Sequence, residues 1–273
     1  MSGLRPLIGI VNLSSNVSND DVIRMVVAIQ DQLKVDVAPS WDRDYWFIMF
    51  YTDPKAISPR AYPVVIIDND TTPAALGWHA EQCGKPYGKI ITDPILKNGG
   101  VILYDTSNPQ NISIASVLSH EIIETFIDPH VNLWIDGPRT AKGSCYAVEA
   151  CDPVENILYK NTASGVDISV SNFVLPAYFD DHNSSDKFDF LGILAAPFTL
   201  APSGHMIVRN APNTEKEVFG KTPPAEWIVG MKSHKLGSRS TCRMSSLKSS
   251  SPWRAAREER LEAHRQKWWK YLI

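Results

Sequence analysis

The chain has 273 residues, of which 44% are hydrophobic and 21% are charged, so it can bury one large core or two modest ones. It has no run of roughly eighteen apolar residues, and we expect no N-terminal secretion signal, because its first residues lack a charged segment followed by an apolar one. We therefore expect no transmembrane segment, and a location in the cytoplasm or within a macromolecular assembly. The four cysteines form no CxxC pair, which argues against a zinc ribbon and a disulfide scaffold.

The N-terminal part has the pattern of alternating strands and helices. An apolar run at 6–11 predicts a buried strand, and aromatic and β-branched runs predict two more strands at 46–51 and 62–67. Between the first two strands, Asn19 or Asp20 can cap a helix whose apolar residues recur at helical spacing. These apolar residues are Val22, Val26, Ile29 and Leu33.

Further along the chain, a second helix stands between short strands. Strands are predicted at 89–92 and 101–104, and helical periodicity then runs from Asn111 to Ile127, where Asp128 and Pro129 end it. The remainder is rich in Gly, Pro and short apolar runs, which favours strands and loops. The strands predicted there are 146–150, 168–175 and 198–208.

The central helix carries a polar face suited to metal chemistry. At about 100° per residue, His120, Glu121, Glu124 and Asp128 fall within an arc of roughly 100°. Zn²⁺ accepts nitrogen and oxygen donors of these types, and residues at i and i+4 can bind one ion. A neighbouring carboxylate can then act as a general base toward water.

The run His120-Glu121-Ile122-Ile123-Glu124 resembles the HExxH motif of the zincin metallopeptidases, and in particular of their metzincin branch. The resemblance covers roughly residues 5–135. It implies a mixed sheet with a central active-site helix, a zinc ion bound by His120, and Glu121 as the general base. His130 stands at the third-ligand position of the metzincins.

Two positions depart from the metzincin pattern. Glu124 replaces the second His, and a carboxylate is a harder zinc ligand. Ile127 replaces the Gly that turns the chain, so the helix can extend to Asp128 and make Asp128 a rival third ligand. The choice among Asp128, His130 and Glu149 as the third ligand stays open.

Other candidate residues flank this helix. The segment 77–91 stands where a zincin has the edge strand that pairs with substrate, and His79 in this segment could face the cleft. Three carboxylates after the helix could serve as ligands or as partners of ligands, and spacing does not choose among them. They are Glu149, Asp152 and Glu155. Nothing marks Cys151 as an activated nucleophile.

The net charge of −3 is unevenly distributed, because the C-terminal segment is basic and the rest of the chain is acidic. Residues 232–273 contain eleven Lys and Arg against three Asp and Glu, whereas residues 1–231 contain sixteen against twenty-seven. The segment 232–251 is predicted to be a flexible linker, and 253–273 a basic helix with exposed tryptophans. Such a tail suits an acidic protein partner, nucleic acid, or packing on the chain's own acidic body, and it could support homo-oligomers.

The predicted class is α+β, in three parts: a zincin-like part at 1–135, a β-rich and loop-rich part at 136–231, and the tail at 232–273. Two functions fit these observations. The first is a metal-dependent, peptidase-like hydrolase acting on a peptide or protein. The second is a non-catalytic assembly protein that keeps a degenerate zincin-like scaffold and docks through its tail.

Overall fold

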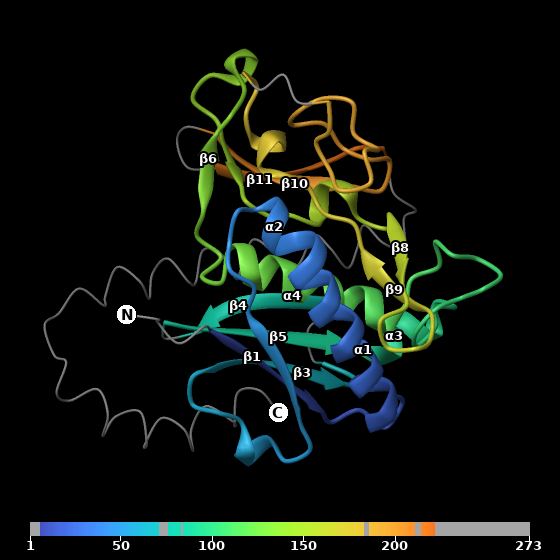
Figure 1. Ribbon diagram of the computed structural model, residues 1–273. Helices are drawn as coiled ribbons and strands as arrows, with labels where there is room; N and C mark the ends of the chain where they lie inside the picture. Colours follow the sequence, from blue (N-terminus) through green and yellow to red (C-terminus); the bar gives the residue numbers. More distant parts are fainter. Residues whose placement is uncertain (1–5, 71–75, 83, 183–185, 211–213, 222–273) are drawn as a thin grey trace, which may run out of the picture.

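The computed structural model describes residues 6–70, 76–82, 84–182, 186–210 and 214–221, and its fold is α+β (Figure 1). Within these residues, five strands form a mixed sheet in the order β2-β1-β3-β5-β4. Four of the strands are parallel, and β4 runs antiparallel to β5 at one edge. The strands are β1 (Leu7–Asn12), β2 (Phe47–Tyr51), β3 (Ala61–Ile67), β4 (Gly77–Gln82) and β5 (Lys85–Ile91).

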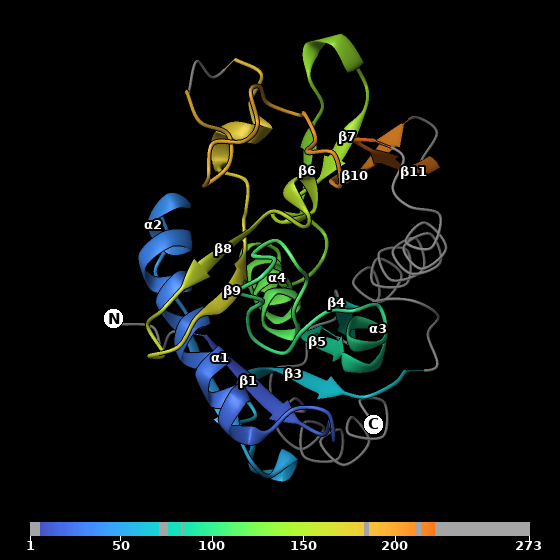
Figure 2. The same cartoon turned by 90° about the vertical axis from the view of Figure 1, so that its right-hand side faces the viewer.

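Helices α1 and α4 cover one face of this sheet, as the two views show (Figures 1 and 2). Ser18 caps the first helix by accepting the backbone N–H of Asp21, so the cap lies one residue before the predicted Asn19. A capping box between Ser113 and Ser116 begins the second. The helical segments are α1 (Asn19–Gln32), the π-helical turn η1 (Leu33–Val37), α2 (Ala38–Ser40), α3 (Thr92–Lys97) and α4 (Ile114–Ile127).

The second half of the described chain is mostly strands and turns, as predicted. Four strands form an antiparallel sheet in the order β11-β10-β7-β6 within the described residues, and β8 pairs with β9. The strands are β6 (Trp134–Asp136), β7 (Cys145–Ala147), β8 (Leu158–Asn161), β9 (Ile168–Ser171), β10 (His205–Asn210) and β11 (Thr214–Phe219). Short 3₁₀ turns are η2 (Pro54–Ala56), η3 (Arg139–Ala141), η4 (Asp152–Val154) and η5 (Pro176–Phe179).

The two halves share one hydrophobic core. Its buried side chains come from the first sheet, from α1 and α4, and from the second half as far as Ala201. The proposed boundary between 135 and 136 falls inside β6, and the proposed tail at 232–273 lies outside the described residues. Helix α4 is consequently covered on several sides by β4, β5 and β9, and each of its residues except His120 is buried (Figure 2).

Four strand predictions were wrong in part. The strands predicted at 146–150 and 168–175 end early, at Ala147 and Ser171. At 101–104 there is a single bridge, from Val101 to Ser113, because the carbonyl groups of this segment accept hydrogen bonds from the start of α4 and from β9. The strand predicted at 198–208 begins only at His205, because a turn closed by the Gly204 N–H to Ala201 carbonyl bond precedes it. Among the described residues, no helix combines the length and the apolar character needed to cross a membrane.

Candidate metal centre

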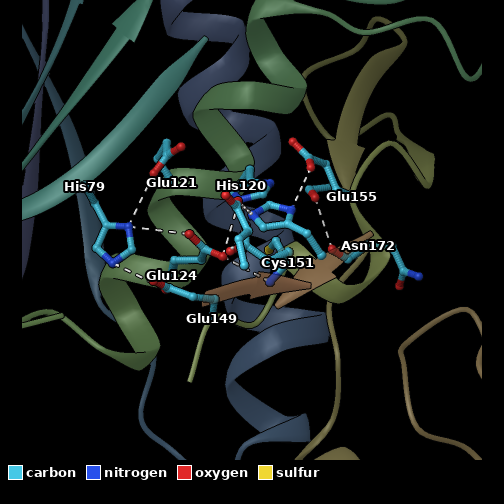
Figure 3. Close-up of polar contacts among 12 residues, drawn as sticks. His79, His120, Glu121, Glu124, Glu149, Cys151, Glu155 and Asn172 are labelled. Carbon is cyan, nitrogen blue, oxygen red and sulfur yellow. Dashed lines mark hydrogen bonds and ion pairs between the residues drawn. The ribbon is translucent and has the colours of Figure 1, made fainter. Parts of the chain in front are cut away.

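Three segments bring acids and histidines together beside the middle of α4 (Figure 3). His120 and Glu124 lie one turn apart on the helix, so their side chains meet on one face. The antiparallel register of β4 directs His79 toward α4, and its ring reaches Glu121 and Glu124. The chain after β7 returns along the same helix and supplies Glu149 and Asp152 from a loop and from the turn η4.

The first group consists of His120, Glu124 and Asp152. The Nε2 atom of His120 lies 3.3 Å from Oε1 of Glu124 and 3.2 Å from Oδ1 of Asp152. Glu124 and Asp152 are buried, and 14% of the His120 side chain is exposed. Ligand atoms about 2.0–2.2 Å from a tetrahedral zinc ion lie roughly 3.3–3.6 Å apart, so these separations fit one ion with little rearrangement.

The second group consists of His79, Glu124 and Glu149. The Nδ1 atom of His79 lies 3.4 Å from Oε2 of Glu124 and 3.3 Å from Oε2 of Glu121, and its Nε2 atom lies 3.9 Å from Oε2 of Glu149. In each of the two groups, one ligand atom per residue lies within 4.8 Å of the others. Glu124 belongs to both groups, with Oε1 facing His120 and Oε2 facing His79.

A third histidine, His205, contacts the oxygen of Asp152 that faces away from His120. His205 of β10 is 1% exposed, and its Nε2 lies 3.1 Å from Oδ2 of Asp152, the oxygen that does not face His120. The other ring nitrogen lies 3.0 Å from Oε2 of Glu155, and Glu217 of β11 lies 3.4 Å from Nε2. A carboxylate held in this way keeps one oxygen directed toward a ligand position.

Interactions within the cluster favour the charged forms of His79, His120 and Glu124, although all three side chains are largely buried. Burial opposes protonation of His79 and of His120, but the adjacent carboxylates outweigh it and raise the pKa of both rings well above the ordinary value. Burial and Asp152 act to raise the pKa of Glu124, yet the two histidines hold it well below its usual range. Burial raises the pKa of the Cys151 thiol, so this cysteine is no activated nucleophile.

The donor set fits a divalent cation. Four carboxylates (Glu121, Glu124, Glu149 and Asp152) lie against two imidazoles, and even two protonated rings would leave the acids in excess. Burial of excess negative charge is costly, and a divalent cation would offset it. In addition, Nε2 of His79 is buried and makes no hydrogen bond to any described residue, although it faces Glu149.

The structure brings together only part of the predicted site. His120 and Glu124 share a group, and Glu121 lies beside His79. Glu149 and Asp152 complete the two groups, whereas Glu155 contacts His205 instead.

Asp128 and His130 do not join either group among the described residues, which corrects the ligand set predicted from the sequence. Asp128 is the residue that ends α4, and its carboxylate accepts the backbone N–H groups of Asn132 and Leu133. His130 points to β4, where its Nδ1 lies 2.5 Å from Oε2 of Glu81.

Sequence reasoning missed His205 and Glu217. They lie on two paired strands of the second half, and no motif or spacing relates them to α4. The strand predicted at 146–150 would have included Glu149, but β7 ends at Ala147 and leaves Glu149 in a loop.

Comparisons of the chain with protein-family models, with curated proteins and with solved structures found no match.

Proposed function

We propose that this chain is a metal-dependent hydrolase with a zincin-like catalytic part, and that its substrates are peptides. The observation that carries the proposal is the convergence of His120, Glu124 and Asp152, with Glu121 directly after His120 on α4. One histidine and two carboxylates supply three protein ligands, which leaves a tetrahedral cation with a position for a further ligand. Zinc is the cation we propose.

The arrangement assigns roles to the chain's own residues. A divalent cation held by the first group would lower the pKa of a water molecule and polarise a carbonyl group. Glu121 precedes Glu124 on the helix by less than one turn and would accept the proton of the attacking water. His79 contacts Oε2 of Glu121 at 3.3 Å and would hold that carboxylate in place.

The edge strand supports a peptide as the substrate. Within the described residues, β4 pairs with β5 alone, so its outer edge can add an extended peptide by backbone hydrogen bonds. The same strand carries His79 at the candidate centre, so a peptide bound along this edge would pass close to Glu121. A mixed sheet with an antiparallel edge strand beside the HExxE helix also supports the resemblance to the zincins.

The metal is tested by elemental analysis of the purified protein and of two histidine variants. We expect zinc at the first group in the wild type and in His130→Ala, the matched control, and loss of that ion together with a lower melting temperature in His120→Ala. Absence of metal from the wild type, or equal metal in both variants, would contradict the proposed centre.

Catalysis is tested with Glu121→Gln. We expect this variant to keep the zinc of the first group and to lose hydrolysis of a peptide library by roughly 100-fold or more, since the base is not a ligand there. An active Gln variant would contradict the role of Glu121. Bound metal with no hydrolysis by the wild type would contradict the catalytic proposal and favour a non-catalytic assembly role.

A further inference from the structure

The feature that the proposed reaction does not explain is the second group, formed by His79, Glu124 and Glu149. All three side chains are buried, and they come from β4, from α4 and from the loop after β7. Zincin-like hydrolysis at the first group requires only the cation held by His120, Glu124 and Asp152, with Glu121 as the base.

The ring of His79 has the orientation of a metal ligand. Its Nδ1 atom faces the carboxylates of Glu121 and Glu124 at 3.3 and 3.4 Å (Figure 3). Its Nε2 atom, on the other side of the ring, faces Glu149 and makes no hydrogen bond to any described residue, although only 5% of the side chain is exposed. Metal-binding histidines commonly donate one ring N–H to a carboxylate and present the other nitrogen to the ion.

The separation of Nε2 from Glu149 also fits a shared ion. At 3.9 Å the two atoms are too far apart for a hydrogen bond. Two ligand atoms that are each about 2.0–2.2 Å from one tetrahedral zinc ion lie roughly 3.3–3.6 Å apart, so a shift of a few tenths of an ångström would let both atoms bind one ion.

We infer that His79, Glu124 and Glu149 form a second divalent-cation site, and that Glu124 bridges it to the first. This inference rests on the proposed function, because Glu124 serves both sites: its Oε1 faces His120, and Glu124 also forms a group with His79 and Glu149 in which one ligand atom per residue lies within 4.8 Å of the others. The donors, one imidazole and two carboxylates, suit Zn²⁺ or Mn²⁺. A second cation would help to stabilise the negative charge that develops on the oxygens of the attacked carbonyl carbon of a peptide bond.

The test is the stoichiometry of Zn²⁺ binding to chelator-treated full-length protein, measured by titration calorimetry and by elemental analysis. We expect two ions in the wild type, one in Glu149→Gln, one in His120→Asn, and two in the control His130→Ala. Glu149→Gln keeps the shape of the side chain, and His79→Gln provides a second variant for the same site. Circular dichroism shows whether each variant is folded.

The alternative results separate this inference from the proposed function. If the wild type binds one ion, and this ion is kept in Glu149→Gln and His79→Gln but lost in His120→Asn, the second site is wrong and the first stands. If the wild type binds one ion and the variants of either group lose it, the two groups share a single ion, and the inference is wrong. No bound ion in the wild type overturns both proposals.

Discussion

Replacement of Asp128 tests whether this residue ends α4 or binds a metal. Its side chain is 1% exposed, and its two oxygens accept the backbone N–H groups of Asn132 at 3.1 Å and Leu133 at 2.8 Å. The turn that these bonds hold includes Val131, a β-branched residue with a positive φ of 51°. The carboxylate therefore stabilises a backbone conformation that the sequence does not itself favour.

The expected cost follows from these two bonds. A hydrogen bond to a charged group contributes about 1.5–3 kcal/mol, and Asp128→Ala removes both acceptors, so we expect a loss of about 3–6 kcal/mol. At roughly 2–4 °C per kcal/mol for a protein of this size, the melting temperature should fall by roughly 10 °C. Asp128→Asn keeps one acceptor oxygen and should lose about half as much.

The assay combines thermal unfolding with elemental analysis of the same samples. We expect both Asp128 variants to keep the metal content of the wild type at temperatures where they are folded, whereas His120→Ala loses metal. If Asp128→Ala were fully folded and had lost its metal, Asp128 would be a ligand and its assignment to the end of the helix would be wrong.

Three further predictions concern stability and reactivity. Hydroxyl groups of Ser14 and Ser15 hold the pKa of Asp68 well below its usual range, so the ionised carboxylate stabilises the fold above about pH 4 and this stabilisation is lost as the pH falls. In urea unfolding, Asp68→Asn should be less stable than the wild type at pH 7, and the difference in free energy of unfolding should shrink at pH 3. A difference that stays constant with pH would refute this. In Gly77→Ala the new Cβ would lie 2.7 Å from a methyl group of Val117, which should cost about 1–3 kcal/mol in urea unfolding, and an unchanged midpoint would contradict the packing of β4 on α4. Because Cys151 is fully buried and its thiol pKa is raised, iodoacetamide at pH 8 should modify the half-buried Cys145 in the native protein and spare Cys151, as mass spectrometry of peptides would show; equal labelling would contradict the burial of Cys151.

The sequence alone determined the local parts of this molecule. The apolar runs at 6–11, 46–51 and 62–67 became three neighbouring strands of the sheet, because alternation and β-branching act within a few residues. The helical period likewise placed His120 and Glu124 on one face of α4, since their angular separation depends only on the helix itself. The three strands and the shared helix face could therefore be predicted without reference to the rest of the chain.

The same local reasoning failed where the helix stopped. Asp128 shares a face with Glu124 only if helical geometry continues, but its φ of −128° and ψ of 71° lie outside the helical region. Pro129 follows it and disfavours a helical conformation for the preceding residue. The carboxylate consequently turns to the backbone of the next loop instead of the metal centre.

Only the tertiary structure decided which residues complete the centre. His79 reaches α4 because β4 lies antiparallel at the edge of the sheet. Glu149 and Asp152 reach the same centre because of the path that the chain takes after β7. His205 reaches Asp152 from a strand of the second sheet. These approaches are set by the packing of segments distant in sequence around one shared core, and no residue spacing along a single chain encodes them.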